Sequence, residues 1–180
     1  MKPYAGQAAP GISKMKRDVV HAHAFPGPRS ATFLDSIVTM TAVAKDGKLA
    51  IAISNEKCGH SIPGGGGGMR IVTLAVSFFG AKDAPLGTTE VQTYGIRYAD
   101  AKGVTPVPKW LASTVVHDAE IPSSGSAQES CAIPAGAKRA EAKLTYYSID
   151  PAYLPALSKR QVDLKDRQPV VLARATAKVH

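Results

Sequence analysis

The alternation of apolar and polar positions is clearest over residues 37–55, where it predicts a β-hairpin. Residues 37–44 are rich in β-branched side chains, and residues 48–55 alternate strictly after the dipeptide Asp46-Gly47. Asp-Gly between two such runs is typical of a type I′ turn, which joins antiparallel strands. Three apolar side chains of the second strand share one face and are expected to enter a core: Leu49, Ile51 and Ile53.

Short strand-like runs continue to the end of the chain. The run 70–79 is almost continuously apolar, which favours a central strand. Further strand-like runs lie at 91–98, 113–118, 128–133, 139–148 and 169–179. About eight short strands separated by glycine and proline indicate an all-β fold, an antiparallel, immunoglobulin-like β-sandwich with less than roughly a quarter helix.

The N-terminal segment differs from the rest. Residues 1–29 show no apolar periodicity and are punctuated by glycine and proline, so we expect an irregular, extended arm before a sandwich domain at 30–180. A short helix is expected over residues 31–36. One or two helical turns are expected over residues 150–159, with Asp150 as the cap and a proline at the first helical position.

Composition is that of a folded domain. Hydrophobic residues make up 44% of the 180 residues and charged residues 20%, which argues against disorder. The net charge of +8 can attract nucleic acid, anionic lipid or an acidic protein. Aromatic residues make up only 6% and do not interleave with basic ones, which disfavours nucleic acid. The longest apolar run, 71–79, is too short to cross a bilayer.

Five consecutive glycines, Gly64–Gly68, form the most unusual stretch of the sequence. A phosphate-binding loop would continue with Gly-Lys-Ser/Thr and a helix, but here Met69 and Arg70 lead into a strand. Two interpretations remain. The run is either a flexible connection or a place where the backbone closely approaches a flat ligand or a partner, because glycine has no Cβ.

Three histidines stand in suggestive contexts. His21 and His23 form an HxH pair, whose imidazoles lie on one face of an extended chain, and His60 follows in Gly-His-Ser-Ile-Pro. Such a pair can bind a transition metal. No further ligands follow at a fixed spacing, so a structural zinc site is not indicated. A copper site made by His21, His23 and His60 remains an alternative.

The two cysteines, Cys58 and Cys131, cannot form a CxxC pair, which excludes a zinc ribbon and a thioredoxin-type site. They are either free thiols or partners in a disulfide, and the disulfide would require an oxidising compartment. Each lies beside a predicted strand end, and we predict that they are bonded. No GxSxG context surrounds any serine, so we expect no enzymatic activity.

Several segments, taken in order, resemble a known family. Residues 21–27 (HAHAFPG) and 55–65 (NEKCGHSIPGG), the latter followed by Arg70, are similar to two motifs of secreted multihaem c-type cytochromes: H-x-F-x-G and N-x-x-x-G-H-x-x-P-x-G. Three later segments match the same family in order: 118–125, 131–134 and 142–146. The resemblance implies the β-sandwich region of such a cytochrome.

One feature of that family is missing from this sequence. The family attaches each haem through a CxxCH motif, and this chain contains none. The opening Met1-Lys2-Pro3 is similar to what often follows such a motif. The resemblance therefore implies haem c held by a partner chain or by an upstream segment, and a multihaem cytochrome subunit or module as the partner.

The function that the resemblance implies is a haem-capping or scaffold module in an extracytoplasmic electron-transfer assembly. His23 matches the histidine of H-x-F and is the first candidate for a distal haem ligand, with Phe25 beside it. His21 is a neighbour that can substitute, and His60 is either a ligand or a structural residue. The rival interpretations are a secreted sandwich that binds carbohydrate or protein, and a copper-binding protein.

Overall fold

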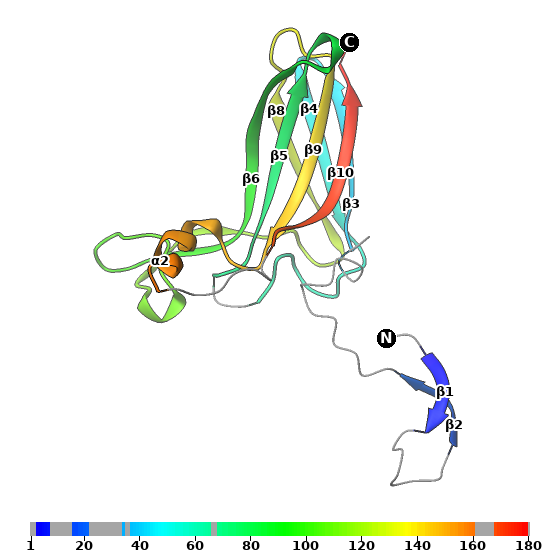
Figure 1. Cartoon of the computed structure of the whole chain (residues 1–180), viewed down its shortest axis with the longest axis vertical. Helices are drawn as coiled ribbons and strands as arrows, with labels where there is room; N and C mark the ends of the chain where they lie inside the picture. Colours follow the sequence, from blue (N-terminus) through cyan, green and yellow to red (C-terminus); the bar gives the residue numbers. More distant parts are fainter. Residues whose placement is uncertain are drawn as a thin grey trace.

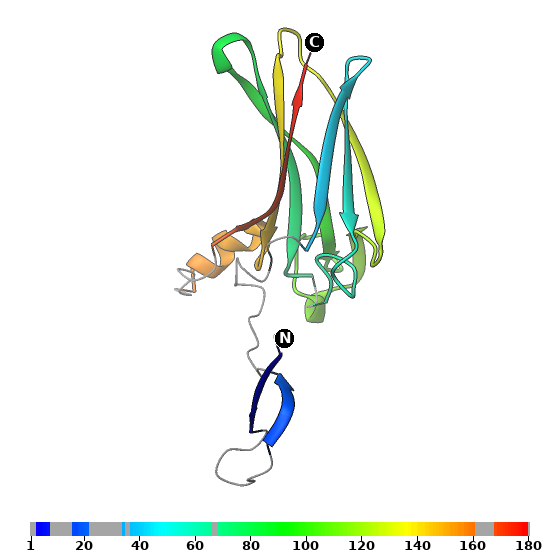
Figure 2. The ribbon, with the colours of Figure 1, turned by 90° about the vertical axis from the view of Figure 1, so that its right-hand side faces the viewer.

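The computed structural model describes residues 3–7, 16–21, 34, 37–65, 68–160 and 168–179. Residues 37 onward form two antiparallel sheets, and Figure 2 shows them as two layers facing each other. The prediction of an all-β antiparallel sandwich is confirmed, with only short helical segments in the described residues. No helix in these residues is long and apolar enough to span a bilayer.

The larger sheet has five strands in the order β10-β9-β5-β6-β7. In chain order these strands are β5 Ile71–Phe79, β6 Pro85–Ala99, β7 Thr114–Ala119, β9 Arg139–Tyr147 and β10 Val170–Lys178. The apolar strand β5 is central, as its sequence predicts: it has a hydrogen-bonded neighbour on each side and no exposed residue.

The smaller sheet contains three strands in the order β3-β4-β8. Their bounds are β3 Thr39–Lys45, β4 Lys48–Asn55 and β8 Gly125–Ala132. Asp46 and Gly47 join β3 to β4 with φ values of 50° and 73°. Two successive positive φ angles are the signature of a type I′ turn, so the predicted hairpin is confirmed. Strand β3 lies beside β10, which closes one side of the sandwich (Figure 1).

The core lies between the two sheets. Leu49, Ile51 and Ile53 are fully buried, as the alternation predicts. They belong to one hydrophobic cluster with residues of the larger sheet, among them Leu74 and Leu144. Burial of each such side chain contributes about 1.5–3 kcal/mol, so this cluster holds the two sheets in a fixed relation and positions the loops at their ends.

The connections contain short helical turns: η1 Ala81–Asp83, η2 Lys109–Leu111, η3 Pro151–Tyr153 and α2 Leu154–Ser158. The predicted turns at 150–159 are confirmed, and the Asp150 carboxylate caps them by accepting from Ala152 N at 2.9 Å. Asp150 is 1% exposed and also pairs with Arg97 at 2.7 Å. Of the helix predicted at 31–36, only Leu34 lies in the described residues, and it is helical.

The N-terminal segment corrects one prediction. Strands β1 Pro3–Gln7 and β2 Lys16–His21 form a two-stranded antiparallel sheet, where an irregular arm was expected. Figures 1 and 2 show this hairpin apart from the sandwich. The residues of these strands show no regular alternation of apolar and polar positions, so the sequence did not indicate them. The domain boundary at 29/30 stays a prediction.

The predicted disulfide between Cys58 and Cys131 is wrong, because both cysteines are free thiols. Cys131 pairs with Leu49 near the beginning of β4, whereas Cys58 follows Asn55 at the end of that strand. Six residues of extended chain between Leu49 and Asn55 span roughly 20 Å. A disulfide requires Cα atoms about 6 Å apart, so the two thiols lie at opposite ends of the smaller sheet.

Candidate functional site

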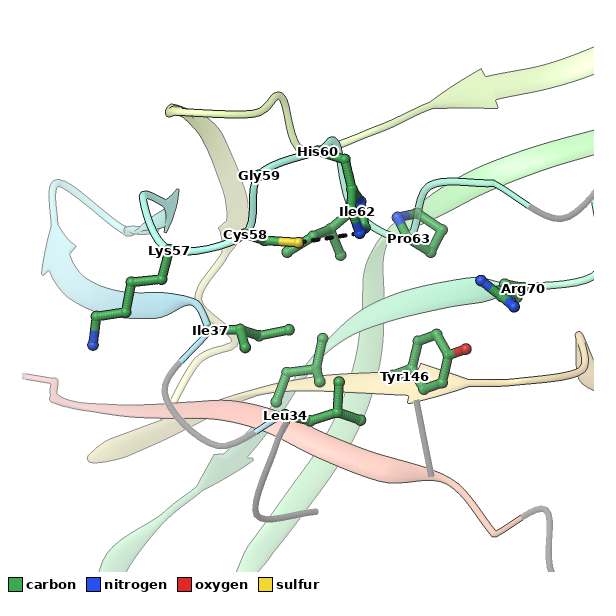
Figure 3. A pocket seen from close by; sticks show the side chains of 11 residues that line it. Leu34, Ile37, Lys57, Cys58, Gly59, His60, Ile62, Pro63, Arg70 and Tyr146 are labelled. Carbon is green, nitrogen blue, oxygen red and sulfur yellow. Dashed lines mark hydrogen bonds between the residues drawn. The ribbon is translucent and has the colours of Figure 1, made fainter. Parts of the chain in front are cut away.

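A cavity of about 380 Å³ lies at one end of the sandwich (Figure 3). At this end β4 and β9 finish and β5 begins. The lining residues come from segments far apart in the sequence: Leu34, Ile37, Lys57, Cys58, Gly59, His60, Ile62, Pro63, Arg70, Tyr146 and Leu172. Most of these side chains are apolar, and a few polar groups face the same space, which is the usual make-up of a ligand site.

Asn55 holds the loop that carries the histidine. Its side chain is fully buried, and its amide donates to the carbonyl oxygens of His60 at 3.0 Å and Pro122 at 3.1 Å. Beside it, Ile62 and Ile121 exchange backbone hydrogen bonds of 2.9 Å in both directions. The loop after β4 is thereby fixed to the connection between β7 and β8, which explains the asparagine of the N-x-x-x-G-H segment.

His60 has one ring nitrogen anchored. Its Nδ1 lies 2.7 Å from the carbonyl oxygen of Ser61. A carbonyl oxygen only accepts, so Nδ1 is the donor, and in the neutral ring Nε2 is the acceptor. Nε2 lies 3.4 Å from Cys58 Sγ, as Figure 3 shows. Histidines that bind metals are oriented in the same way, with the second ring nitrogen bonded to a carbonyl.

The glycine run begins against this histidine. Gly64 has φ of 52°, and a Cβ there would lie 2.7 Å from His60 Nδ1 and collide with the carbonyl oxygen of Ser61. Only glycine fits such a position. The close approach at Gly64 is therefore to the chain's own histidine, and the two interpretations of the run stay open. Residues 66 and 67 lie outside the described residues.

One buried polar group of the cavity, the hydroxyl of Tyr146, is not satisfied by the described residues. Tyr146 is 5% exposed, and its hydroxyl has no hydrogen-bond partner in the described residues. Burial raises the pKa of this hydroxyl, and the positive charge of Arg70 opposes the rise. Arg70 also lines a second, more polar hollow of about 490 Å³, together with His60, Gly64, Gly65, Ser61 and Glu120. The two hollows thus meet at His60 and Arg70.

Of the other predicted cofactor-binding residues, the structure describes only His21. His21 ends β2, while His23 and Phe25 lie outside the described residues, so the predicted ligand role of His23 and the copper trio stay predictions. In the part of the chain that the structure describes, no three His, Cys, Asp or Glu side chains are grouped as a metal site. The sequence predicts a strand face shared by Leu144 and Tyr146, but it does not show that the tyrosine faces a cavity.

The comparisons with known proteins concern the fold. No family model and no curated protein matches the chain. Among solved structures, a penta-haem cytochrome c552 from Thermochromatium tepidum is similar, with a TM-score of 0.68 and 19% sequence identity. The match covers 85% of this chain and 42% of that cytochrome. The chain therefore spans less than half of the cytochrome that it resembles, and the likeness is one of fold.

Proposed function

We propose that this chain is a β-sandwich module of a multihaem electron-transfer assembly. In this proposal it covers a haem that a partner chain or another segment attaches, and it supplies an imidazole to the iron. The observation that carries the proposal is the His60 ring, anchored through Nδ1 at 2.7 Å, on a fold shared with part of a penta-haem cytochrome. The haem would supply one-electron transfer, and two imidazole ligands favour low-spin iron.

The residues at this end of the sandwich fit a haem edge. A haem presents a flat apolar ring, an iron that accepts a nitrogen lone pair, and carboxylates at one edge. The described end offers apolar walls such as Ile37 and Ile62, the lone pair of His60 Nε2, which faces the Cys58 thiol at 3.4 Å, and the cations of Arg70 and Lys57. Neither cysteine lies in a CxxCH motif, so the haem would be attached elsewhere.

His23 remains a second candidate ligand in the proposal. It occupies the histidine position of the H-x-F segment, next to Phe25, and His21 lies two residues before it. A module with two such histidines would serve either one haem or two. The role proposed for the chain is to bind and to position rather than to catalyse, and c-type haem partners imply an extracytoplasmic location.

Copper binding is a second candidate function, and the short distance between a thiol and an imidazole favours it. The Cys58 thiol lies 3.4 Å from His60 Nε2, and thiolate and imidazole together suit Cu(I). Competition between the purified chain and a Cu(I) chelator measures this binding. A copper site requires that Cys58→Ser and His60→Ala each abolish it, whereas a haem ligand requires His60 alone.

Titration of the full chain with a haem c peptide that carries one histidine ligand tests the haem proposal. Binding of a second imidazole converts the iron to the low-spin bis-histidine state, which shifts the Soret band. We expect His60→Ala to prevent this conversion if His60 is the ligand, and His23→Ala to prevent it if His23 is. His117→Gln is the matched control, since His117 Nε2 lies 2.8 Å from the carbonyl oxygen of Thr93. If the haem iron of the peptide stays high-spin in the presence of wild-type protein, the proposal is contradicted.

A further inference from the structure

The hydroxyl of Tyr146 points to a ligand that the protein itself does not supply. Tyr146 lies near the end of β9, opposite Val72, and its side chain lines the 380 Å³ cavity. It is 5% exposed, and its hydroxyl has no hydrogen-bond partner within the described part of the chain. Buried hydroxyls nearly always find a partner, because burial without one is unfavourable.

Arg70 supplies the charge. In Figure 3 the Tyr146 hydroxyl and the Arg70 guanidinium lie on the same side of the cavity, and the charge of Arg70 acts on that hydroxyl. Three other arginines pair with carboxylates at 2.7 to 2.9 Å: Arg97, Arg139 and Arg174. Arg70 is partly buried and has no carboxylate within 4.0 Å in the described residues. A half-buried, unpaired guanidinium beside an unpaired hydroxyl is an anion-binding arrangement.

The remainder of the cavity is apolar. Its walls include Leu34, Ile37, Ile62 and Leu172. The volume of about 380 Å³ lies within the range of pockets that hold small molecules. A ligand that satisfies the whole cavity must therefore combine an apolar body with an acidic group.

We propose that this cavity binds an amphipathic carboxylate. The carboxylate accepts hydrogen bonds from the guanidinium of Arg70 and the hydroxyl of Tyr146, and the apolar body lies against the four aliphatic side chains named above. A planar carboxylate has two oxygens for these two donors. The same chemistry has two sources: a free monocarboxylic acid, or the propionate edge of a haem held by a partner. Only the second source rests on the proposed function.

Calorimetric titration of the full chain with octanoate and with octan-1-ol tests the acidic group. We expect octanoate to bind at least about tenfold more tightly than the alcohol, because only the carboxylate makes charge-assisted hydrogen bonds. Tyr146→Phe keeps the ring and removes only the hydroxyl, and Arg70→Gln removes the charge. Each substitution should weaken octanoate binding at least about tenfold.

Arg139→Gln is the matched control, because Arg139 pairs with Asp83 and Glu141 and does not line the cavity. It should leave octanoate affinity unchanged. Circular dichroism confirms that each variant is folded, and Tyr146→Phe carries the test if Arg70→Gln fails to fold. Equal affinity for acid and alcohol, absence of octanoate binding, or affinity unaffected in Tyr146→Phe would each overturn the proposal for a free acid.

A haem c peptide, compared with its propionate dimethyl ester, distinguishes the sources. If the propionates occupy the cavity, the ester binds more weakly to wild-type protein, and Arg70→Gln removes the difference while the His60-dependent Soret shift remains. Octanoate binding without any haem-peptide binding supports the inference and contradicts the proposed function. Haem-peptide binding through His60 that is insensitive to esterification, together with no octanoate binding, overturns the inference and leaves the proposed function standing.

Discussion

The side-chain amide of Asn55 donates a hydrogen bond to the backbone carbonyl oxygen of His60 across 3.0 Å. The same amide donates to the carbonyl oxygen of Pro122 at 3.1 Å. One buried side chain therefore joins the end of β4, the histidine loop and the connection between β7 and β8. The geometry of the candidate site depends on this side chain, although it does not line the cavity.

Replacement of Asn55 by Ala should lower the free energy of unfolding by about 2 kcal/mol, because a fully buried side chain and its hydrogen bonds to two partly buried carbonyl oxygens are lost. Urea denaturation followed by circular dichroism measures this difference. Ser54→Ala is the control, since Ser54 makes only an exposed hydrogen bond to Glu56 and should change stability by less than about 0.5 kcal/mol. An equal, small effect of both substitutions would show that Asn55 does not hold the loop.

Gly64→Ala should disturb His60 as well as stability. Gly64 and Gly136 both have positive φ, 52° and 81°, so Ala at either position costs about 1–2 kcal/mol of backbone strain. A Cβ meets nothing within 4 Å at Gly136, but at Gly64 it meets the His60 ring. Urea denaturation should show the larger loss for Gly64→Ala. Only this variant should shift the NMR signals of the His60 ring, and unchanged signals would contradict the close approach.

Both cysteines should react with an alkylating reagent in unreduced protein, because they are free thiols at opposite ends of the smaller sheet. Mass spectrometry should find two added groups. Burial raises the pKa of the Cys131 thiol, so at a given pH less of it is thiolate. In a Cys58→Ser variant, the alkylation rate of Cys131 should therefore rise at a higher pH in folded protein than in unfolded protein. A native protein that takes up no label contains the disulfide after all.

Stability should fall at alkaline pH. Burial, and then a 2.9 Å hydrogen bond from its hydroxyl to Glu129, raise the pKa of Tyr94 well above its ordinary value. A raised pKa means that the folded state favours the neutral phenol. This contribution is complete below the unfolded pKa of about 10 and is lost as pH rises above it, at up to about 1.4 kcal/mol per pH unit for each such group.

Urea denaturation between pH 8 and pH 11 measures that loss. Burial also raises the pKa values of Tyr146 and Tyr153, so several phenols contribute. Tyr94→Phe removes one of them and should make the decline less steep. A decline of the same slope in Tyr94→Phe would mean that Tyr94 ionises equally well in the folded and unfolded chain.

Local signals explain which elements could be predicted. The hairpin at 37–55 was predictable because strict alternation and the Asp46-Gly47 turn both act over neighbouring residues. The helical turns after Asp150 were predictable for the same reason, since a cap and a following proline are local features. The N-terminal hairpin carries no such signal, because its residues show no regular alternation of apolar and polar positions.

The cavity and the separation of the two thiols depend on how neighbouring strands align. That alignment could not be predicted from the sequence. Arg70 and Tyr146 line the same cavity because β5 and β9 pair in one particular alignment. Tyr146 alternates with Leu144 as a core residue would, so its unpaired hydroxyl could not be foreseen. The disulfide prediction failed similarly: Cys58 and Cys131 both lie near strand ends, but at opposite ends of β4.

The most direct test of a haem-capping role uses the tagged full-length chain, purified from cells that produce its whole assembly. We predict that a c-type cytochrome accompanies it, with the visible and EPR spectra of low-spin, bis-histidine haem. His60→Ala and His23→Ala, tested singly and together, should convert one haem to the five-coordinate or water-ligated state. A chain that purifies without haem, or haem spectra unchanged in the double variant, would contradict the role proposed here.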